Sequence, residues 1–115
     1  MYVTHEPVDL SFDKVGIKGK IFPVDNLTKD IEFVRIDTVI GHATKIIEHE
    51  STFCYYVLEG NGYFEIDGEK EACSKGDLVV IPPGHAFIYK GNLKLLLVDT
   101  PPWREEQEET LGEEK

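Results

Sequence analysis

Short runs of β-branched and aromatic residues, separated by turn-forming residues, fill the chain from Glu32 to Asp99. Such runs predict short strands, and turn signals every 8–12 residues or so are typical of a sandwich or a closed barrel. No long amphipathic helix pattern interrupts them, which disfavours a sheet built from alternating strands and helices. The runs read FVRIDTVI, TKIIEH, FCYYVL, YFEID, DLVVI, AFIYK and LKLLLVD.

Turn residues divide the chain into three parts of one all-β domain. Residues 1–31 are predicted to form an irregular N-terminal arm with short edge strands, because prolines and glycines interrupt their apolar pairs. Residues 32–100 are predicted to form the sandwich or barrel. Asp67-Gly68 is the clearest hairpin signal within them, since a type I′ turn needs two residues with positive φ. Residues 101–115 begin with two prolines and hold six Glu, which predicts a short acidic C-terminal helix or solvated tail.

The charge of the chain excludes several classes of partner. With 22 acidic and 12 basic residues the net charge is -10, so no basic surface is available to displace counterions from nucleic acid. Anionic membranes are disfavoured for the same reason, and no apolar stretch approaches the length of a membrane span. The N-terminus lacks the pattern of a signal peptide. Because neither Cys54 nor Cys73 belongs to a CxxC pair, we expect a cytoplasmic protein with reduced thiols.

Two segments resemble the two sequence motifs of the cupins, which are small jelly-roll β-barrels. The first is GHATKIIEHESTFCYYVLEG, from Gly41 to Gly60, and the second is GDLVVIPPGHAFIYKG, from Gly76 to Gly91. The glycines and the proline Pro82 fall at the spacings of the family motifs. The resemblance therefore implies an all-β fold of the cupin type, a jelly-roll β-barrel.

In cupins, two His and a Glu of the first motif and a His of the second usually hold a metal ion. A catalytic first-row metal normally needs at least three protein ligands. The match retains one of the four, so we predict no metal cofactor. The four positions correspond to Ile47, His49, Phe53 and Phe87. A spacer of four residues before the Glu position, in place of three, would instead place Ile46 and Glu48 at the first two positions.

Replacement ligands remain an open alternative. His85 lies two residues before Phe87, so in a regular strand both side chains point to one face, although Gly84 can change that parity. A site rebuilt from His49, His85 and a carboxylate would then be possible. The competing interpretation places both His on the surface.

The predicted barrel interior is aromatic. If Phe53 and Phe87 point inward, the period of two places Tyr55 and Tyr89 on the same face. Rings that carry hydroxyl groups suit an organic ligand, which they can stack against and hydrogen-bond. The same rings could equally fill the barrel as a core. The predicted ligand-binding residues are His49, Phe53, Tyr55, His85, Phe87 and Tyr89.

These observations predict a cupin that binds a small polar organic ligand, sugar-like or a small acid, without a metal. The alternative is a metal-dependent cupin enzyme of the dioxygenase, isomerase or decarboxylase type, with a site around His49. A third interpretation is a closed barrel with a structural role only. The residues alone assign no catalytic group. The resemblance also implies a homodimer, since many single-domain cupins exchange N-terminal strands, and residues 1–10 would be the exchanged arm.

Overall fold

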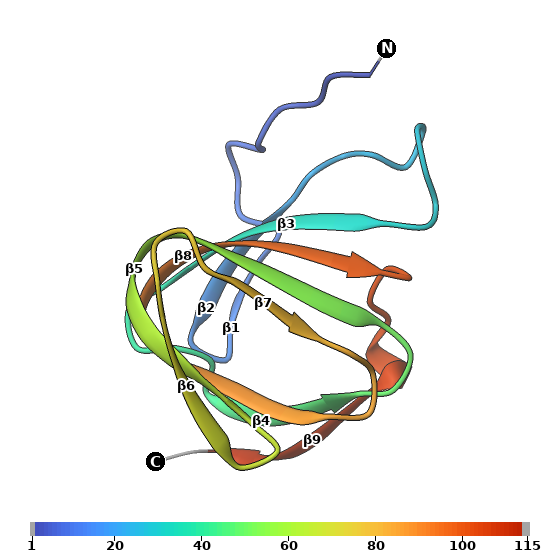
Figure 1. Cartoon of the computed structure of the whole chain (residues 1–115). Coiled ribbons are helices and arrows are strands. Elements are labelled where there is room, and N and C mark those ends of the chain that lie inside the picture. Colours follow the sequence, from blue (N-terminus) through green and yellow to red (C-terminus); the bar gives the residue numbers. More distant parts are fainter. Residues whose placement is uncertain (1, 114–115) are drawn as a thin grey trace.

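A computed structural model describes residues 2–113 of the chain (Figure 1). Within this range the residues form nine β-strands and one turn of 3-10 helix, η1. No helix in this range is long and apolar enough to cross a membrane. The elements are β1 (Phe12–Lys14), β2 (Ile17–Ile21), β3 (Glu32–Thr38), β4 (Thr44–Glu48), β5 (Thr52–Ile66), β6 (Glu69–Ser74), β7 (Leu78–Ile81), β8 (Ala86–Thr100), η1 (Glu105–Gln107) and β9 (Glu108–Glu113).

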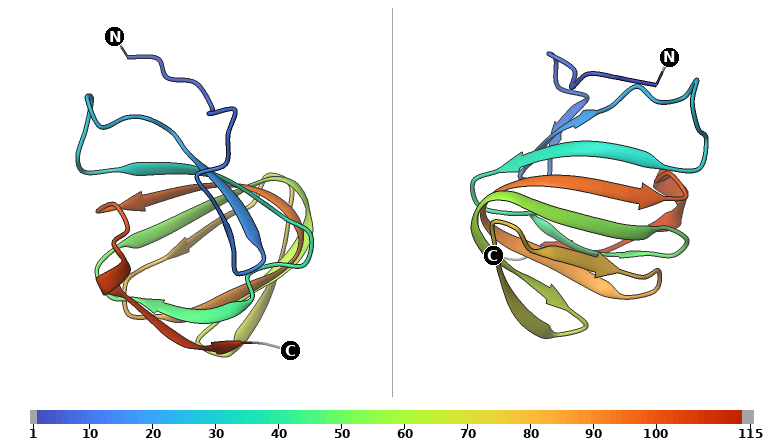
Figure 2. Two further views of the ribbon diagram at one scale, coloured as in Figure 1. Left: turned by 180° about the vertical axis from the view of Figure 1, so that it is seen from behind. Right: turned by 45° about the horizontal axis from the view of Figure 1, so that its top comes forward.

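Two long strands, β5 and β8, belong to both layers of the barrel. The first part of β8 pairs with β4 and its second part pairs with β3, while β5 pairs with β8 along nearly its whole length. One layer is therefore β1-β2-β3-β8-β5-β7, and the other is β9-β4-β8-β5-β6. All pairings are antiparallel, and the curled sheet encloses one interior (Figures 1 and 2). This arrangement confirms the all-β, cupin-type jelly-roll barrel.

Glycines permit the sharp bend shared by β5 and β8. Gly60 has a φ of 96°, and a Cβ atom there would lie 2.0 Å from the carbonyl oxygen of Asn92. Gly91 has a φ of 128°, and its Cβ would lie 2.5 Å from the oxygen of Asn61. The two backbones therefore touch where the strands pass from one layer to the other, and only glycine satisfies both the close approach and the left-handed φ.

The predicted hairpin at Asp67-Gly68 is confirmed. Asp67 has a φ of 50° and Gly68 a φ of 85°, and they connect β5 directly to β6. Both values are positive, as a type I′ turn requires. The register of this hairpin pairs Ile66 with Glu69 and Phe64 with Glu71.

The C-terminal segment differs from the expected helix. Helical structure is limited to η1, and the following residues form β9, which pairs with β4. The reason is that β4 has β8 on one side only, so its other edge offers backbone groups that a segment after the two prolines can pair with. The side chain of Gln107 is buried and donates hydrogen bonds to Glu48 Oε1 at 3.0 Å and to Ser51 Oγ at 3.3 Å. Residues 114 and 115 lie outside the described part of the chain.

The N-terminal residues run outside the barrel before β1 begins (Figure 2). β1 and β2 form a hairpin that pairs with β3 at the edge of its layer. Glu6 forms ion pairs with Lys20 at 3.5 Å and Arg35 at 3.3 Å, whereas Tyr2 and Val8 expose about nine-tenths of their surface. Met1 lies outside the described residues.

Candidate functional site

Five aromatic side chains meet inside the barrel. Tyr55 packs against Tyr89 with 5.3 Å between ring centroids, Phe64 lies 5.0 Å from Tyr89, and Phe53 lies 5.9 Å from Phe87. None of the five is more than 5% exposed. Alternation explains the pairs Phe53 and Tyr55 in β5 and Phe87 and Tyr89 in β8, because residues two apart in a strand share a face, whereas Phe64 follows a register shift in β5. Four of the predicted site residues, Phe53, Tyr55, Phe87 and Tyr89, therefore come together, with Phe64 beside them.

The hydroxyl group of Tyr89 is buried without a hydrogen-bond partner in residues 2–113. A buried polar atom is normally paired, so such an exception calls for a reason. Burial raises the pKa of Tyr89, and it raises the pKa of Tyr55 well above the usual value, with the neighbouring Tyr89 as a second cause. Both phenols are therefore protonated at neutral pH and can donate hydrogen bonds into the interior.

His42 joins this aromatic cluster, although it is not among the site residues predicted from the sequence. Its ring lies 5.6 Å from the Tyr89 ring in an edge-on orientation, and its side chain is buried. The backbone explains the approach, because the His42 amide donates to the Tyr89 carbonyl at 2.9 Å just before β4 begins. His42 follows Gly41 between two of the predicted strand runs, and a turn residue gives no parity from which the direction of its side chain can be predicted.

The hydrogen bonds of His42 indicate which of its ring nitrogen atoms carries the proton. Nδ1 lies 2.7 Å from the Thr44 carbonyl oxygen, which can only accept, and 3.2 Å from the Thr44 amide nitrogen. The shorter contact assigns the proton to Nδ1, and this leaves Nε2 as an acceptor. Burial lowers the pKa of His42, and the positive charge of Lys90, which donates to the His42 carbonyl at 3.1 Å, lowers it further. His42 is thus a neutral base beside Tyr89.

The two predicted His residues do not join the cluster. In β4 the buried side chains are those of Ile46 and Glu48, whereas the side chain of His49 is 51% exposed and lies 3.1 Å from Glu109 Oε1. The four-residue spacer before the Glu position therefore describes the strand, and the expected inward direction of Ile47 and His49 is corrected.

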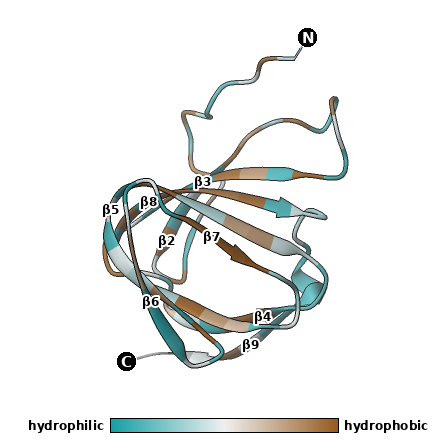
Figure 3. Ribbon diagram, in the orientation of Figure 1, coloured by the Kyte–Doolittle hydropathy of each residue, from teal (hydrophilic) through white to brown (hydrophobic). Residues whose placement is uncertain are grey.

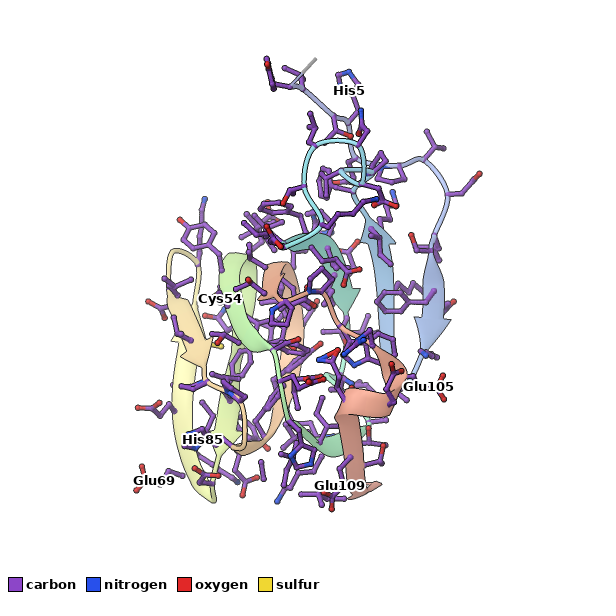
Figure 4. The ribbon with its side chains drawn as sticks, turned by 90° about the vertical axis from the view of Figure 1, so that its right-hand side faces the viewer. His5, Cys54, Glu69, His85, Glu105 and Glu109 are labelled. Atoms are coloured by element: carbon purple, nitrogen blue, oxygen red, sulfur yellow. The ribbon has the colours of Figure 1, made fainter. Side chains whose placement is uncertain are left out.

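His85 also lies at the surface. Its Nδ1 is 2.5 Å from Asp67 Oδ2, and its side chain is 44% exposed. Figure 4 shows His85 and Glu109, the partner of His49, at the periphery of the molecule. The expected shared face of His85 and Phe87 is thus not found, because the turn at Gly84 precedes β8 and interrupts the alternation.

The residues at the family's metal positions do not fit a metal ion. With the register seen in β4 these positions hold Ile46, Glu48, Phe53 and Phe87, so only one of four side chains offers a donor atom. No group of three or more His, Cys, Asp or Glu side chains within residues 2–113 could hold a metal ion.

Three acidic side chains gather at the end of the interior that lies beneath η1. Glu48 accepts hydrogen bonds at Oε1 from the amides of Glu50 and Ser51, both at 2.9 Å, while its Oε2 has no partner within residues 2–113. Asp99 is 1% exposed, and its Oδ1 is also without a partner there. Asp99 pairs with Glu32 across β8 and β3 and forms a side-chain hydrogen bond with it.

Burial raises the pKa of Asp99 to about 8, and the negative charges of Glu32 and Glu48 add to the effect. Burial raises the pKa of Glu32 as well. The two carboxyl groups therefore share a proton at neutral pH, with Asp99 as the donor of the hydrogen bond and Glu32 as the acceptor.

The surface hollows formed by residues 2–113 include two of similar volume. One, of about 360 Å³, lies between β6 and β7, and its wall includes Phe64 of the aromatic cluster together with Ile66, Cys73 and Val79. The other, of about 350 Å³, lies at the bend around Gly60 and Asn92 and touches no member of the cluster. β7 supplies a hydrophobic wall and β6 a largely hydrophilic one (Figure 3). Of these two hollows, the first is the one whose wall includes a member of the cluster.

Solved structures similar to this one include several of PAC13 from Streptomyces. A structure of Pac13, described as a nucleoside dehydratase, has a TM-score of 0.82 and 24% sequence identity, and the match covers 96% of this chain and 86% of that one. The Y55F variant of PAC13 with uridine has a TM-score of 0.87 at 23% identity and covers 98% and 93% of the two chains. The H42Q and Y89F variants with uridine are similar as well. These likenesses show the fold.

Two further comparisons concern the sequence. The uncharacterized protein MJ1618 of Methanocaldococcus jannaschii is 33% identical over 93 residues, which cover 75% of this chain and 74% of that protein. Residues 37–100 match the family described as the cupin domain. This matched segment contains β4 to β8 and all the aromatic residues of the cluster. Fold, motifs and matched family agree, and the chain belongs to the cupin family.

Proposed function

We propose that the barrel interior binds a nucleoside and that His42, Tyr55 and Tyr89 catalyse the loss of water from it. The observation that carries this proposal is the meeting of these three side chains in one buried cluster. They have the same residue types and numbers as the positions substituted in the uridine-bound structures of Streptomyces PAC13. The proposal includes the ligand-binding role predicted for Phe53 and Phe87, as apolar walls.

The properties of the cluster suit such a ligand. A nucleoside combines a flat base with a sugar rich in hydroxyl groups, and the cluster combines aromatic faces with phenolic donors. The unpartnered hydroxyl of Tyr89 is available for a sugar or base oxygen. The hollow of about 360 Å³ beside Phe64 is within the usual range of ligand pockets.

His42 and a tyrosine can also act as the base and the acid in an elimination of water. His42 Nε2 takes a proton from a sugar carbon, the C–H electron pair forms a C=C bond, and the neighbouring C–O bond breaks. A tyrosine hydroxyl supplies the proton with which the departing oxygen leaves as water, and the proton on His42 returns to the tyrosine through solvent. Imidazole is too weak a base for an ordinary sugar C–H, so the substrate must carry a carbonyl next to that carbon.

A His42→Gln variant is expected to lower turnover at least 100-fold, because glutamine keeps a polar side chain but cannot accept the proton. The assay follows loss of one water by mass spectrometry, with uridine oxidised at one ribose carbon as the substrate. Uridine binding, measured by calorimetry, should change by less than about 3-fold. His85→Gln is the matched control, since His85 lies at the surface.

Two results would contradict the proposal. If the wild-type protein fails to bind uridine at millimolar concentration, the cluster is a packed core, which is the structural interpretation of the barrel. If uridine binds but none of the oxidised nucleosides loses water, the protein is a binding module without this activity.

We also propose that the protein is a homodimer in which residues 1–10 dock on the partner. The exposed apolar side chains of this arm, among them Tyr2, Val3 and Val8, support the proposal. Light scattering of the full chain should give twice the monomer mass, and a deletion of residues 1–10 should give monomers. A dimer that persists after the deletion would show that another surface forms it.

A further inference from the structure

The acidic end of the interior is not used by the proposed elimination. Its three carboxyl groups, from Glu32, Glu48 and Asp99, come from β3, β4 and β8 and face one another closely enough for their charges to interact. None of them takes part in an ion pair within residues 2–113. With one proton shared between Glu32 and Asp99, this end of the barrel carries excess negative charge in a buried place.

Two buried oxygen atoms at this end also lack donors. These are Oε2 of Glu48 and Oδ1 of Asp99, on side chains that are 3% and 1% exposed. Leaving such acceptors unsatisfied is costly, and leaving buried charge without a counter-charge costs more. Both costs would be relieved by a single group that brings positive charge and several N–H donors.

The acidic end lies close to the aromatic cluster. Phe53 of the cluster is the cross-strand partner of Asp99, and the charge of Asp99 raises the pKa of Tyr55. Because no set of three acidic or His side chains within residues 2–113 could hold a metal ion, a bare metal cation does not fit. An organic ammonium group does, since its N–H bonds supply the missing donors.

We propose that Glu48 and Asp99 bind a protonated amine carried by the ligand of the barrel, so that the substrate class is a nucleoside that carries an amino group in addition to the carbonyl required for the elimination. The inference rests on the proposed function for the identity of the ligand body. The claim about the amine rests on the acidic end alone.

The pH dependence of binding follows from the groups around Asp99. Those that face it are Glu32 from β3, Glu48 from β4, Tyr55 from β5 and, near Tyr55 and Glu48, Glu108 from β9. An ammonium group beside Asp99 favours the carboxylate and lowers its pKa, so binding releases a proton below about pH 8. The affinity for an amine should therefore rise between about pH 6 and pH 8, while that for uridine should not.

The test is calorimetric titration of the full chain at about neutral pH with uridine, 5′-amino-5′-deoxyuridine, 3′-amino-3′-deoxyuridine and n-butylammonium chloride. At least one amino nucleoside should bind about 10-fold more tightly than uridine or better. Glu48→Gln should reduce this advantage to less than about 3-fold, because glutamine keeps the acceptor for the amides of Glu50 and Ser51 but loses the charge. Asp99→Asn is the second variant, and Asp67→Asn, which removes a surface carboxylate, is the control.

The outcomes separate the two proposals. If uridine binds and neither amino nucleoside binds more tightly, the amine site is wrong and the nucleoside site stands. If n-butylammonium binds in a Glu48-dependent manner while no nucleoside binds, the amine site stands and the proposed function is wrong. If no probe binds, both are overturned. An advantage for amino nucleosides that persists in both Glu48→Gln and Asp99→Asn would assign the amine to other residues.

Discussion

An Asp99→Asn variant is expected to be more stable than the wild-type protein at about pH 8 and to lose much of the pH dependence of unfolding. The pKa of Asp99 is raised to about 8 in the folded protein, whereas an unfolded Asp titrates near 3.8. Folding therefore takes up a proton between these two values, and the free energy of unfolding falls as pH rises through this window. Asparagine stays neutral and does not contribute to that fall.

The size of the stability loss follows from the pH range between the pKa of Asp99 in the unfolded protein and that in the folded protein. At about 1.4 kcal/mol per pH unit, the wild-type protein loses up to about 4 kcal/mol of stability from Asp99 between pH 5 and pH 8. The raised pKa values of Glu32 and Glu108 act in the same direction, so a smaller slope remains in the variant. Urea unfolding of both proteins at pH 5, 6.5 and 8 measures the pH dependence of the free energy of unfolding, since the midpoint reports stability when the m value is constant.

Asp67→Asn is the matched control for this experiment. It removes one carboxylate at the surface, and asparagine can still accept the hydrogen bond from the Ala86 amide. The hydrogen bond from His85 lowers the pKa of Asp67, so the sign of its contribution is opposite to that of Asp99. A slope as steep in Asp99→Asn as in the wild-type protein would mean that Asp99 ionises normally in the fold.

A Gly60→Ala variant is expected to lose more than about 3 kcal/mol of stability or to fail to fold. The added Cβ would lie 2.0 Å from the Asn92 carbonyl oxygen and 3.2 Å from Leu93 Cα, which are backbone atoms of the paired strand. A backbone cannot rotate away as a side chain can, so β5 and β8 must separate at the bend. The left-handed φ of 96° adds strain of its own.

Gly68→Ala separates these two causes. Gly68 has a comparable φ of 85°, but no atom lies within 4 Å of its added Cβ. Only the cost of the left-handed conformation applies there, about 1–2 kcal/mol. Chemical unfolding of both variants gives the difference. Equal losses at the two positions would show that the close approach at Gly60 relaxes without cost.

Most strands were predicted well from the sequence, because runs of β-branched and aromatic residues and the turns between them depend on neighbouring residues only. The runs of Val, Ile, Phe and Tyr lie in β3, β4, β5, β7 and β8, with two runs joined in each of β5 and β8, and Asp67-Gly68 became the tight turn. The C-terminal segment was predicted less well. The glutamates that follow the two prolines favour a helix. The open edge of β4, however, is a partner far away in the sequence, and no local pattern reveals it. Tertiary pairing therefore overrode the local preference at β9.

At the candidate site, the predictions also succeeded where they depended on local sequence and failed where they depended on the surrounding structure. Alternation correctly placed Phe53, Tyr55, Phe87 and Tyr89 inside the barrel, because parity is reliable within a long strand. It failed at His49 because the expected register of β4 was one residue out, so that Ile46 and Glu48 point inward. It failed at His85 because the turn at Gly84 interrupts the alternation before β8. His42 could not be predicted from parity for the same reason. The unusual titration of Asp99 depends on packing against Glu32 and Glu48 and has no signature in the sequence.

The continuity of β5 and β8 through both layers has a consequence for how the protein opens. A sandwich whose sheets are joined only by loops can release one sheet while the other persists, which gives separate cooperative units. Here neither layer can lose its central strands without unravelling those of the other. Amide protons of both layers should therefore exchange with deuterium at a single limiting rate set by global unfolding, and faster exchange should be confined to the arm, the edge strands and the C-terminal segment.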